Sequence, residues 1–372
     1  MKYYLIAGEA SGDLHASNLM QAILEEDPQA EFRFWGGDLM QKVGGILVKH
    51  YKDLAFMGFV EVLANLKTIL ANIRFCKKDI QQFHPDAIIF VDYPGFNLQI
   101  AKWAKLQGYP THYYISPQIW AWKEGRIKDI KRNIDYMYVI LPFEKEFYEE
   151  KHKFPVHFVG NPLIDAIANR NKINLNEFQA KHNLPNKPII AILPGSRKQE
   201  ISKMLYVMLK VVEDYPDYQF VIAGAPSQEA EFYKKTIGSK DVKLIFGETY
   251  NLMDVAHAAM VTSGTATLET ALFKVPEVVC YKGNYFSYLI AKRIINLKYI
   301  SLVNLILDKE AVTELIQNNF NTKTLKIELD KLLDKESRAK IIKDYNQLEK
   351  ILGGEGASKT TAKLLVDSLK IS

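Results

Sequence analysis

Hydrophobic runs that read as strands alternate with helix-like segments along the chain, and the whole alternation occurs twice. In the first half each run is short, rich in aliphatic and aromatic residues, and followed by a turn and a helical segment. The predicted strands are Lys2–Ala7, Glu31–Trp35, Ala87–Val91, Thr111–Ile115 and Tyr136–Ile140. Repeated strand–loop–helix units predict a parallel sheet with helices on both faces. In such a sheet, ligands bind beyond the carboxyl ends of the strands.

The second half begins again after a proline-containing linker at Asn183–Lys187. Its predicted strands are Ile189–Leu193, Gln219–Ala223, Val242–Phe246, Met260–Thr262 and Glu277–Tyr281. A chain of 372 residues is long enough for two domains of about 150–200 residues each. We therefore expect an α/β protein with two Rossmann-like domains, residues 1–180 and 186–345, whose parallel sheets face each other across a cleft. Residues 346–372 are expected to form a C-terminal helical tail.

The composition excludes several classes of protein. Lysine and arginine number 48 against 43 aspartate and glutamate residues, and the net charge of +5 suits an anionic substrate or a membrane surface. The two cysteines, Cys76 and Cys280, form neither a metal-ligand cluster nor a disulfide framework, which favours a reducing cytoplasm. The N-terminus lacks the apolar core of a signal peptide, and no run of about 18 apolar residues predicts a transmembrane helix.

Two loops of small residues follow predicted strands in the second half. The first is Gly195, Ser196 and Arg197, where backbone N–H groups approach an anion closely and a guanidinium suits phosphate. An ordinary strand-to-helix turn with a surface arginine explains this tripeptide equally well.

The second loop is Ser263–Glu269, in which Ser263, Gly264 and Thr265 open the approach to a helix N-terminus. Glu269 lies about one turn further on, where a carboxylate would accept both hydroxyls of a ribose. Helix capping is the alternative for this loop taken alone. Two such loops in one domain favour a site for a nucleoside diphosphate.

Asp92 ends the strand-like run Ala87–Val91 and is the best candidate for a general base. Burial at the end of an apolar strand raises the pKa of a carboxyl toward the range in which it accepts a proton at neutral pH. The alternative is an aspartate that caps the turn beside Pro94.

The loop Gly8–Asp13 follows the first predicted strand and is placed to hold polar groups of an acceptor. It lacks the three-glycine spacing of a dinucleotide fingerprint, so NAD binding is not expected. The alternative is a plain turn in which Asp13 caps a helix running from about Leu14 to Glu26. His15 is either a second acid or base, or a residue on the helix surface.

Two further segments combine apolar or aromatic residues with cations. Trp120 and Trp122 precede a basic run that suits nucleic acid, a sugar phosphate or an anionic membrane, or else a packed aromatic pair beside a solvated helix. Met57–Lys78 is helical in pattern and either lies in a membrane interface or fills the core of the first domain. Its apolar stripe is Phe59, Leu63, Leu66, Leu70 and Ile73, flanked by Lys67, Arg74, Lys77 and Lys78.

Eight motifs stand in a characteristic order along nearly the whole chain. They are Gly8–Asp13, Met57–Val62, Asp92–Asn97, Tyr114–Trp122, Leu141–Glu144, Leu193–Arg197, Ser263–Glu269 and Ser301–Leu305. Together they resemble the motifs of the lipid-A-disaccharide synthase family. One departure is Val303, at a position where the family usually has proline. The resemblance implies the GT-B fold, in which two Rossmann-like domains flank a cleft.

The resemblance also implies a reaction. UDP-2,3-diacylglucosamine and 2,3-diacylglucosamine 1-phosphate would join to give a β-1,6-linked lipid A disaccharide 1-phosphate and UDP, at the cytoplasmic face of the inner membrane. The first domain would bind the acceptor and face the membrane, and the second would bind the UDP-sugar. The implied base is Asp92, and the implied donor-binding residues are Gly195, Ser196, Arg197, Ser263, Gly264, Thr265, Glu269 and Asn304.

Attack from the face opposite UDP would invert the anomeric carbon. Because no Asp-x-Asp pair lies near either small-residue loop, we expect neither a metal nor another cofactor. One rival is a UDP-sugar 2-epimerase, which would not need the apolar stripe. The other is a nucleic-acid-binding module, which the 43 acidic residues and the lack of a recognised motif disfavour. The sequence leaves open whether two copies form a homodimer.

Overall fold

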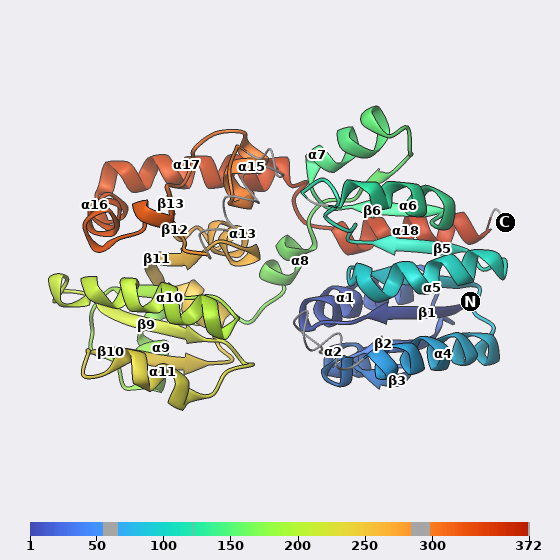
Figure 1. The fold of residues 1–372 in the computed structure, drawn as a ribbon, viewed down its shortest axis with the longest axis horizontal. Helices are drawn as coiled ribbons and strands as arrows, with labels where there is room; N and C mark the ends of the chain where they lie inside the picture. Colours follow the sequence, from blue (N-terminus) through green and yellow to red (C-terminus); the bar gives the residue numbers. More distant parts are fainter. Residues whose placement is uncertain (55–65, 122, 284–297, 371–372) are drawn as a thin grey trace. The chain divides into compact units, whose positions relative to one another are not determined.

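The computed structural model describes residues 1–54, 66–121, 123–283 and 298–370. The chain divides into two compact units, Met1–Ala168 with Leu352–Ser372 (unit 1) and Asn169–Ile351 (unit 2). Both units contain a parallel sheet with helices on its two faces, as the sequence predicts (Figure 1).

Unit 1 is built on a seven-stranded parallel sheet in the order β3-β2-β1-β4-β5-β6-β7. The strands are β1 (Lys2–Ala7), β2 (Glu31–Gly36), β3 (Ile46–His50), β4 (Ala87–Val91), β5 (Thr111–Tyr114), β6 (Tyr136–Val139) and β7 (His157–Phe158). The central strands β1 and β4 pair with Ala7 opposite Val91, and all five residues of β4 are buried. A continuous apolar run of this kind suits a strand covered on both faces.

Helices cover both faces of the unit 1 sheet. One face packs on α4 (Leu66–Phe83), α5 (Pro94–Leu106) and α6 (Ile127–Asn133). The other packs on α1 (Ala10–Glu26), α2 (Asp38–Val43) and α18 (Ala357–Lys370). The shorter elements are η1 (Tyr51–Leu54), η2 (Glu124–Arg126), α7 (Pro142–Lys145), η3 (Glu146–Lys151) and α8 (Pro162–Ala168).

Unit 2 contains a six-stranded parallel sheet in the order β10-β9-β8-β11-β12-β13. The strands are β8 (Ile189–Leu193), β9 (Gln219–Gly224), β10 (Val242–Phe246), β11 (Ala256–Thr262), β12 (Glu277–Tyr281) and β13 (Glu314–Ile316). The helices are α9 (Leu175–His182), α10 (Lys198–Met208), η4 (Leu209–Asp214), α11 (Ala230–Ile237), α12 (Thr249–Val255), α13 (Thr265–Leu272), α15 (Leu302–Leu307), η5 (Gln317–Asn319), α16 (Thr322–Leu333) and α17 (Lys335–Ile351).

All ten predicted strands are present, and the described residues form three further strands that the sequence did not predict. β3, β7 and β13 lie at the edges of the two sheets. β7 has two residues and β13 has three, and every residue of β3 is at least partly exposed. Short edge strands carry little of the hydrophobic pattern that marks a central strand, so the sequence signal is weak there.

The division between the units differs from the expected boundaries at 180 and 186. Residues from Asn169 onward belong to unit 2 because Arg170 forms an ion pair with Asp254 and Phe178 of α9 is fully buried in the unit 2 core. The expected separate tail at 346–372 is also divided. α17 ends in unit 2 at Ile351, whereas α18 buries its apolar face against the unit 1 core.

Candidate functional site

Asp92 follows β4 at the carboxyl edge of the unit 1 sheet, as expected. Its backbone is left-handed, with φ of +46°, and so is that of Tyr93, with φ of +49°. Two hydrogen bonds to the Asp92 carbonyl oxygen hold this unusual turn: the Tyr113 hydroxyl donates at 2.6 Å and the Asn97 amide donates at 2.7 Å. Consecutive non-glycine residues in this region are strained and persist only where their surroundings enforce them. The turn therefore presents Asp92 at a fixed place on the sheet edge.

The electrostatic setting of Asp92 suits a base. Burial raises the pKa of Asp92 to about 6, and the negative charge of Glu9 adds to the rise, while a hydrogen bond from the Tyr93 backbone N–H lowers it. A carboxyl with this pKa is ionised at neutral pH and is a stronger proton acceptor than an ordinary aspartate. Proton abstraction from an alcohol is chemistry that this position can support.

The loop after β1 lies against the Asp92 turn. A Cβ atom on Gly8 would stand 2.3 Å from Cδ1 of Tyr93, so only glycine fits there without movement of the tyrosine. This close approach is possible because β1 and β4 are neighbours and both end at this edge. The backbone of Gly8 and the Asp92–Tyr93 turn thus form one packed surface.

Helix α1 begins at Ala10, earlier than the expected start near Leu14, and Asp13 is therefore not its N-cap. The Asp13 carboxylate instead accepts backbone N–H groups at the start of α2: Gly37 at 2.8 Å, Leu39 at 3.1 Å and Met40 at 3.1 Å. A buried carboxylate at a helix N-terminus satisfies donors that the helix itself leaves unpaired. Asp13 thereby fixes α2 to the loop that follows β1.

His15 is buried, so the alternative of a helix surface residue is wrong. Burial lowers the pKa of His15 to about 4, and the nearby charge of Asp165 opposes this only partly. The imidazole is therefore neutral at neutral pH. Its Nδ1 atom has no hydrogen-bond partner among the described residues.

The Tyr114–Trp122 motif is held by a carboxylate that the sequence analysis did not single out. Glu144 is almost fully buried and accepts from the Ser116 hydroxyl at 2.6 Å and from the Trp120 indole at 3.2 Å. It also accepts the backbone N–H groups of Ile140 and Leu141. Burial raises the pKa of Glu144, and the hydrogen bond from Ser116 is the largest of the opposing effects. Glu144 thus anchors the loop containing Trp120.

The basic run after this loop is the solvent-facing side of η2 and α6. Ile127 and Ile130 point into the core, whereas Lys128, Lys131 and Arg132 are exposed. Trp122 lies outside the described residues. This arrangement is the solvated amphipathic helix that the sequence analysis gave as an alternative.

In unit 2, both small-residue loops line one cavity of about 240 Å³ at the carboxyl edge of the sheet. β8 and β11 are adjacent strands, with Leu193 opposite Val261, so the loops that follow them meet. Predicted residues that line the cavity are Gly195, Ser196, Ser263, Gly264 and Thr265. The left-handed φ of +104° at Gly195 explains the glycine in the first loop.

Arg197 and Glu269 lie close to this cavity in sequence but do not line it. The Arg197 side chain is 73% exposed and pairs with Glu200 at 3.4 Å, and Glu200 itself lines the cavity. The Glu269 carboxylate accepts the hydroxyl of Tyr250 at 3.0 Å, and burial raises its pKa. Both side chains would have to exchange these partners to contact a nucleotide.

Asn304 has a structural role instead of an open binding position. Its amide nitrogen donates to the Val312 carbonyl at 2.8 Å and to Glu314 at 3.0 Å. Its amide oxygen accepts the N–H groups of Ala311 and Val312. All donors and acceptors of this buried side chain are occupied, so Asn304 fixes α15 to the segment before β13. The chain just before α15 is coupled to the cavity, because the Ser263 hydroxyl donates to the Ile300 carbonyl at 3.1 Å.

Several cavity residues were missed by the sequence analysis. They are Glu200, Gly224, Ala225, Pro226, Thr249 and Thr262, together with Leu193, Ala223 and Ala266. The signal for three of them was present, because Gly224, Ala225 and Pro226 follow directly after a predicted strand between the two loops. Among the described residues, no group of three or more His, Cys, Asp or Glu residues is arranged to hold a metal ion.

The proposed apolar stripe is divided between the core and the surface. Ile73 is buried in the unit 1 core and Ile69 packs against it, whereas Leu70 is 44% exposed and Phe75 is 47% exposed. Phe59 and Leu63 lie outside the described residues, as does the Leu66 side chain. No helix within the described ranges has the length and apolar character needed to cross a membrane.

Sequence relatives decide the family. A family model described as lipid-A-disaccharide synthetase matches residues 3–366. The chain belongs to the lipid-A-disaccharide synthase family. A lipid-A-disaccharide synthase of Syntrophus aciditrophicus is 38% identical over 379 residues, covering 99% of this chain and 98% of that protein. One from Coxiella burnetii is 36% identical, covering 97% and 96%. Membership makes the chain a glycosyltransferase of lipid A biosynthesis.

Solved structures share the fold of this family member. An S. aureus MnaA–UDP co-structure aligns with a TM-score of 0.72 at 15% identity, covering 100% of this chain and 97% of that one. A UDP-GlcNAc 2-epimerase from Neisseria meningitidis bound to UDP-GlcNAc aligns with a TM-score of 0.69 at 15% identity, covering all of both chains. At such identities the likeness concerns the GT-B fold alone, and the family match disfavours the epimerase alternative.

Proposed function

We propose that the enzyme transfers 2,3-diacylglucosamine from UDP to the 6-hydroxyl of 2,3-diacylglucosamine 1-phosphate with inversion at the anomeric carbon. The observation that carries this proposal is family membership, together with an aspartate of raised pKa in unit 1 and a cavity lined by two small-residue loops in unit 2. The test is thin-layer analysis after incubating radiolabelled UDP-sugar with the lipid acceptor. A labelled disaccharide and UDP are expected. Conversion of the UDP-sugar to a 2-epimer without acceptor would instead support the rival activity.

At the acceptor, Asp92 would take the proton of the attacking hydroxyl. An alcohol is a poor nucleophile at neutral pH, and a positioned base contributes about 10²–10⁴-fold to the rate. The raised pKa of Asp92 and the rigid turn around it both support this role. The proton would remain on Asp92 until it exchanges with water after product release.

At the donor, the cavity of unit 2 would hold the diphosphate of UDP. Backbone N–H groups near Gly195 and at the start of α13 are suited to the negative charge that develops on the leaving group. Arg197 would leave Glu200 and join the phosphates, because its contact with Glu200 is long at 3.4 Å and a guanidinium can bind phosphate through two parallel hydrogen bonds. We propose Glu269 for the ribose hydroxyls, and no metal ion is part of this scheme.

Arg197→Ala and Glu269→Ala are each expected to weaken UDP binding about tenfold or more. Each change removes a charge-assisted hydrogen bond worth about 1.5–3 kcal/mol. Titration calorimetry with UDP measures the effect directly. Arg132→Ala removes another exposed arginine, from unit 1, and serves as the control. Unchanged affinity in both test variants would place the nucleotide elsewhere.

We also propose that unit 1 docks on an anionic membrane surface through the exposed side of α4. Both lipid substrates of the proposed reaction are diacylated, so the enzyme would meet them at the bilayer surface. Lys67, Arg74 and Lys78 are exposed along one side of the helix, with Leu70 and Phe75 beside them. At a membrane interface, apolar side chains bind by burying their surface among the lipids, and flanking cations bind by attraction to anionic headgroups.

The double variant Leu70→Ser/Phe75→Ser should reduce co-sedimentation with anionic liposomes while changing thermal stability little. Substitutions at exposed positions usually change the free energy of unfolding by about 0.5 kcal/mol or less. Ile327→Ser, with 47% exposure on α16 of unit 2, is the matched control and should bind liposomes normally. Ile73→Ser should instead lower the melting temperature, because Ile73 is buried. A stable double variant that sediments like the parent protein would contradict the docking surface.

A further inference from the structure

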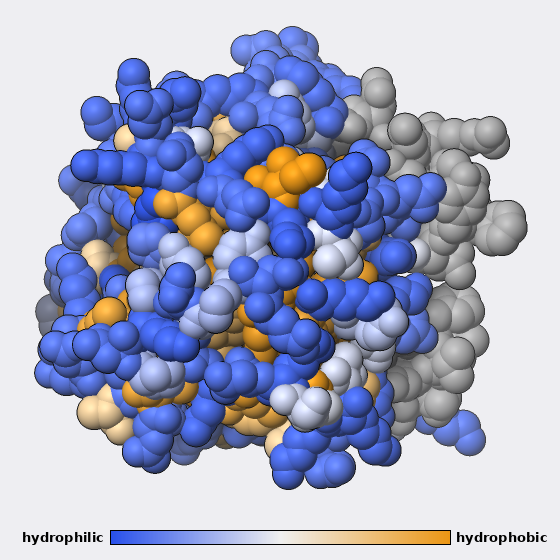
Figure 2. Space-filling view, turned by 90° about the vertical axis from the view of Figure 1, so that its left-hand side faces the viewer, coloured by the Kyte–Doolittle hydropathy of each residue, from blue (hydrophilic) through white to orange (hydrophobic). Residues whose placement is uncertain are grey.

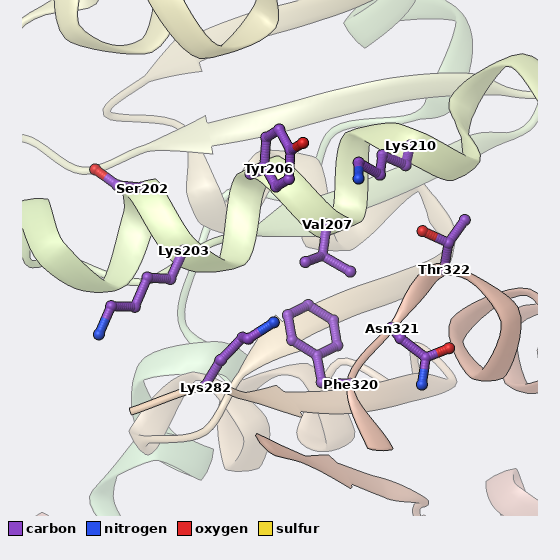
Figure 3. A pocket seen from close by; sticks show the side chains of 9 residues that line it. All are labelled: Ser202, Lys203, Tyr206, Val207, Lys210, Lys282, Phe320, Asn321 and Thr322. Carbon is purple, nitrogen blue, oxygen red and sulfur yellow. The ribbon is translucent and has the colours of Figure 1, made fainter. Parts of the chain in front are cut away.

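A second cavity in unit 2, of about 390 Å³, is lined by lysines and has no assigned role. Lys203 and Tyr206 come from α10 and Lys210 from η4, while Lys282 follows β12 and Phe320 precedes α16. Figure 3 shows Lys282 reaching toward the helix that carries the other two lysines from the opposite side of the cavity. We call this cavity the lysine groove.

The charge of the lysine groove is unbalanced. Among the residues that the structure describes, three ammonium groups line the groove and no acidic residue does. None of the three forms an ion pair within the described part of the chain, although Lys210 lies 4.3 Å from the centre of the Tyr206 ring. Acidic residues of the same helical segment are engaged elsewhere: Glu200 with Arg197, Glu213 with Lys240, and Asp214 with Lys326. The whole chain of 372 residues carries a net charge of only +5, so three lysines without an ion pair around one cavity concentrate positive charge there.

The rest of the lining defines what kind of anion fits. Phe320 is fully buried and Val207 is 7% exposed, so they form an apolar floor beneath the amines. Tyr206 is 57% exposed at the side of the cavity. The Thr322 hydroxyl adds a further polar group. Cations around an apolar floor suit a phosphate group attached to an apolar or ring-bearing body.

The side of unit 2 that Figure 2 shows is mostly hydrophilic. Figure 2 looks at the left-hand side of Figure 1, where α10, β10 and α16 lie, and shows hydrophilic residues over most of that face. Hydrophobic residues appear there only in small separated patches. A broad apolar docking area is therefore not visible on this side, whereas the lysine groove offers concentrated charge.

We propose that the lysine groove binds a phosphate-bearing anion at a site separate from the nucleotide cavity. No residue lines both cavities. Both cavities border α10: Glu200 lines the nucleotide cavity, and Ser202, two residues further along the helix, lines the lysine groove. The inference does not depend on the proposed transfer reaction.

The first test is calorimetric titration of the full chain with pyrophosphate in the presence of saturating UDP, which blocks the nucleotide cavity. Lys203→Gln/Lys210→Gln/Lys282→Gln is expected to weaken pyrophosphate binding about tenfold or more. The control Lys335→Gln/Lys340→Gln/Lys343→Gln removes the same charge from α17 and should bind like the parent protein. UDP affinity should be unchanged in both variants, which shows that unit 2 is folded and separates this test from that of the proposed function.

The second test distinguishes a lipid headgroup from a free phosphate compound. The same proteins are sedimented with phosphatidylglycerol vesicles and with phosphatidylcholine vesicles. If the groove variant, but not the control, loses binding to phosphatidylglycerol vesicles, the natural ligand is a lipid headgroup. If the groove variant loses pyrophosphate binding but still binds the vesicles, the natural ligand is a soluble phosphate compound. Either result supports the proposal. Groove and control variants that match the parent protein in both measurements would overturn it.

Discussion

Replacing Asp92 with asparagine is expected to lower turnover by about two orders of magnitude or more without unfolding the protein. Asparagine has nearly the same size and tolerates the left-handed backbone found at this position. The hydrogen bonds from Tyr113 and Asn97 go to the backbone carbonyl, so they should persist in the variant. What is lost is the carboxylate that would accept the proton. Steady-state kinetics and thermal melting of the purified variant measure both parts of this expectation.

The pH profile tests the same role independently. Because the base works only when ionised, kcat/KM of the parent enzyme should rise with pH and level off above the Asp92 pKa of about 6. Glu9→Gln removes a negative charge that raises this pKa, so its profile should move to lower pH. Near-normal turnover in Asp92→Asn, or a profile that Glu9→Gln leaves in place, would argue against the general-base assignment.

Gly8→Ala should destabilise unit 1 and reduce activity strongly, although it adds only one methyl group. The new Cβ would stand 2.3 Å from the Tyr93 ring, and the ring is attached to the turn that positions Asp92. Forced overpacking of this kind costs about 1–3 kcal/mol. Thermal unfolding and turnover are the two measurements.

Two further variants make the Gly8 result specific. Gly95→Ala lies in the same region, where an added Cβ meets no atom within 4 Å, and it should leave stability close to that of the parent. Combining Gly8→Ala with Tyr93→Ala removes the clash, so the double variant should be more stable than the sum of the single effects suggests. A Gly8→Ala protein with parental melting and turnover would show that the two loops are not packed as described.

Central strands and glycine loops were predictable because their signals are local. The run Ala87–Val91 is recognisable as a buried strand from its own residues. The loops that follow β8 and β11 meet because neighbouring parallel strands end at the same edge of a sheet. Asn304 shows the limit of this reasoning. Its motif marks the family, yet its amide is engaged by Val312 and Glu314, and no spacing in the sequence indicates those contacts.

The anchoring role of Glu144 could not be predicted from its motif for the same reason. Glu144 is bonded to Ser116, which lies 28 residues away in sequence, and this contact exists only after β5 and β6 pair. The unit boundary was equally hard to place. A proline-containing linker at Asn183–Lys187 looked like the division, but the packing of Phe178 decides that α9 belongs to unit 2. The sequence thus predicts which segments form strands and helices better than it predicts which distant side chains contact each other.

The C-terminal helix has a consequence for the order in which a nascent chain can fold. α18 buries Ala362, Leu365 and Val366 in the same cluster as Ala16 and Leu19 of α1. During synthesis the apolar side of α1 is therefore fully covered only after α18 has been made. Unit 2 is continuous from Asn169 to Ile351, so it has all of its residues earlier. Domains that are complete in sequence fold as units during synthesis, and contacts between distant segments form slowly. The apolar side of α1 thus remains open to chaperones and to aggregation until after unit 2 has been made.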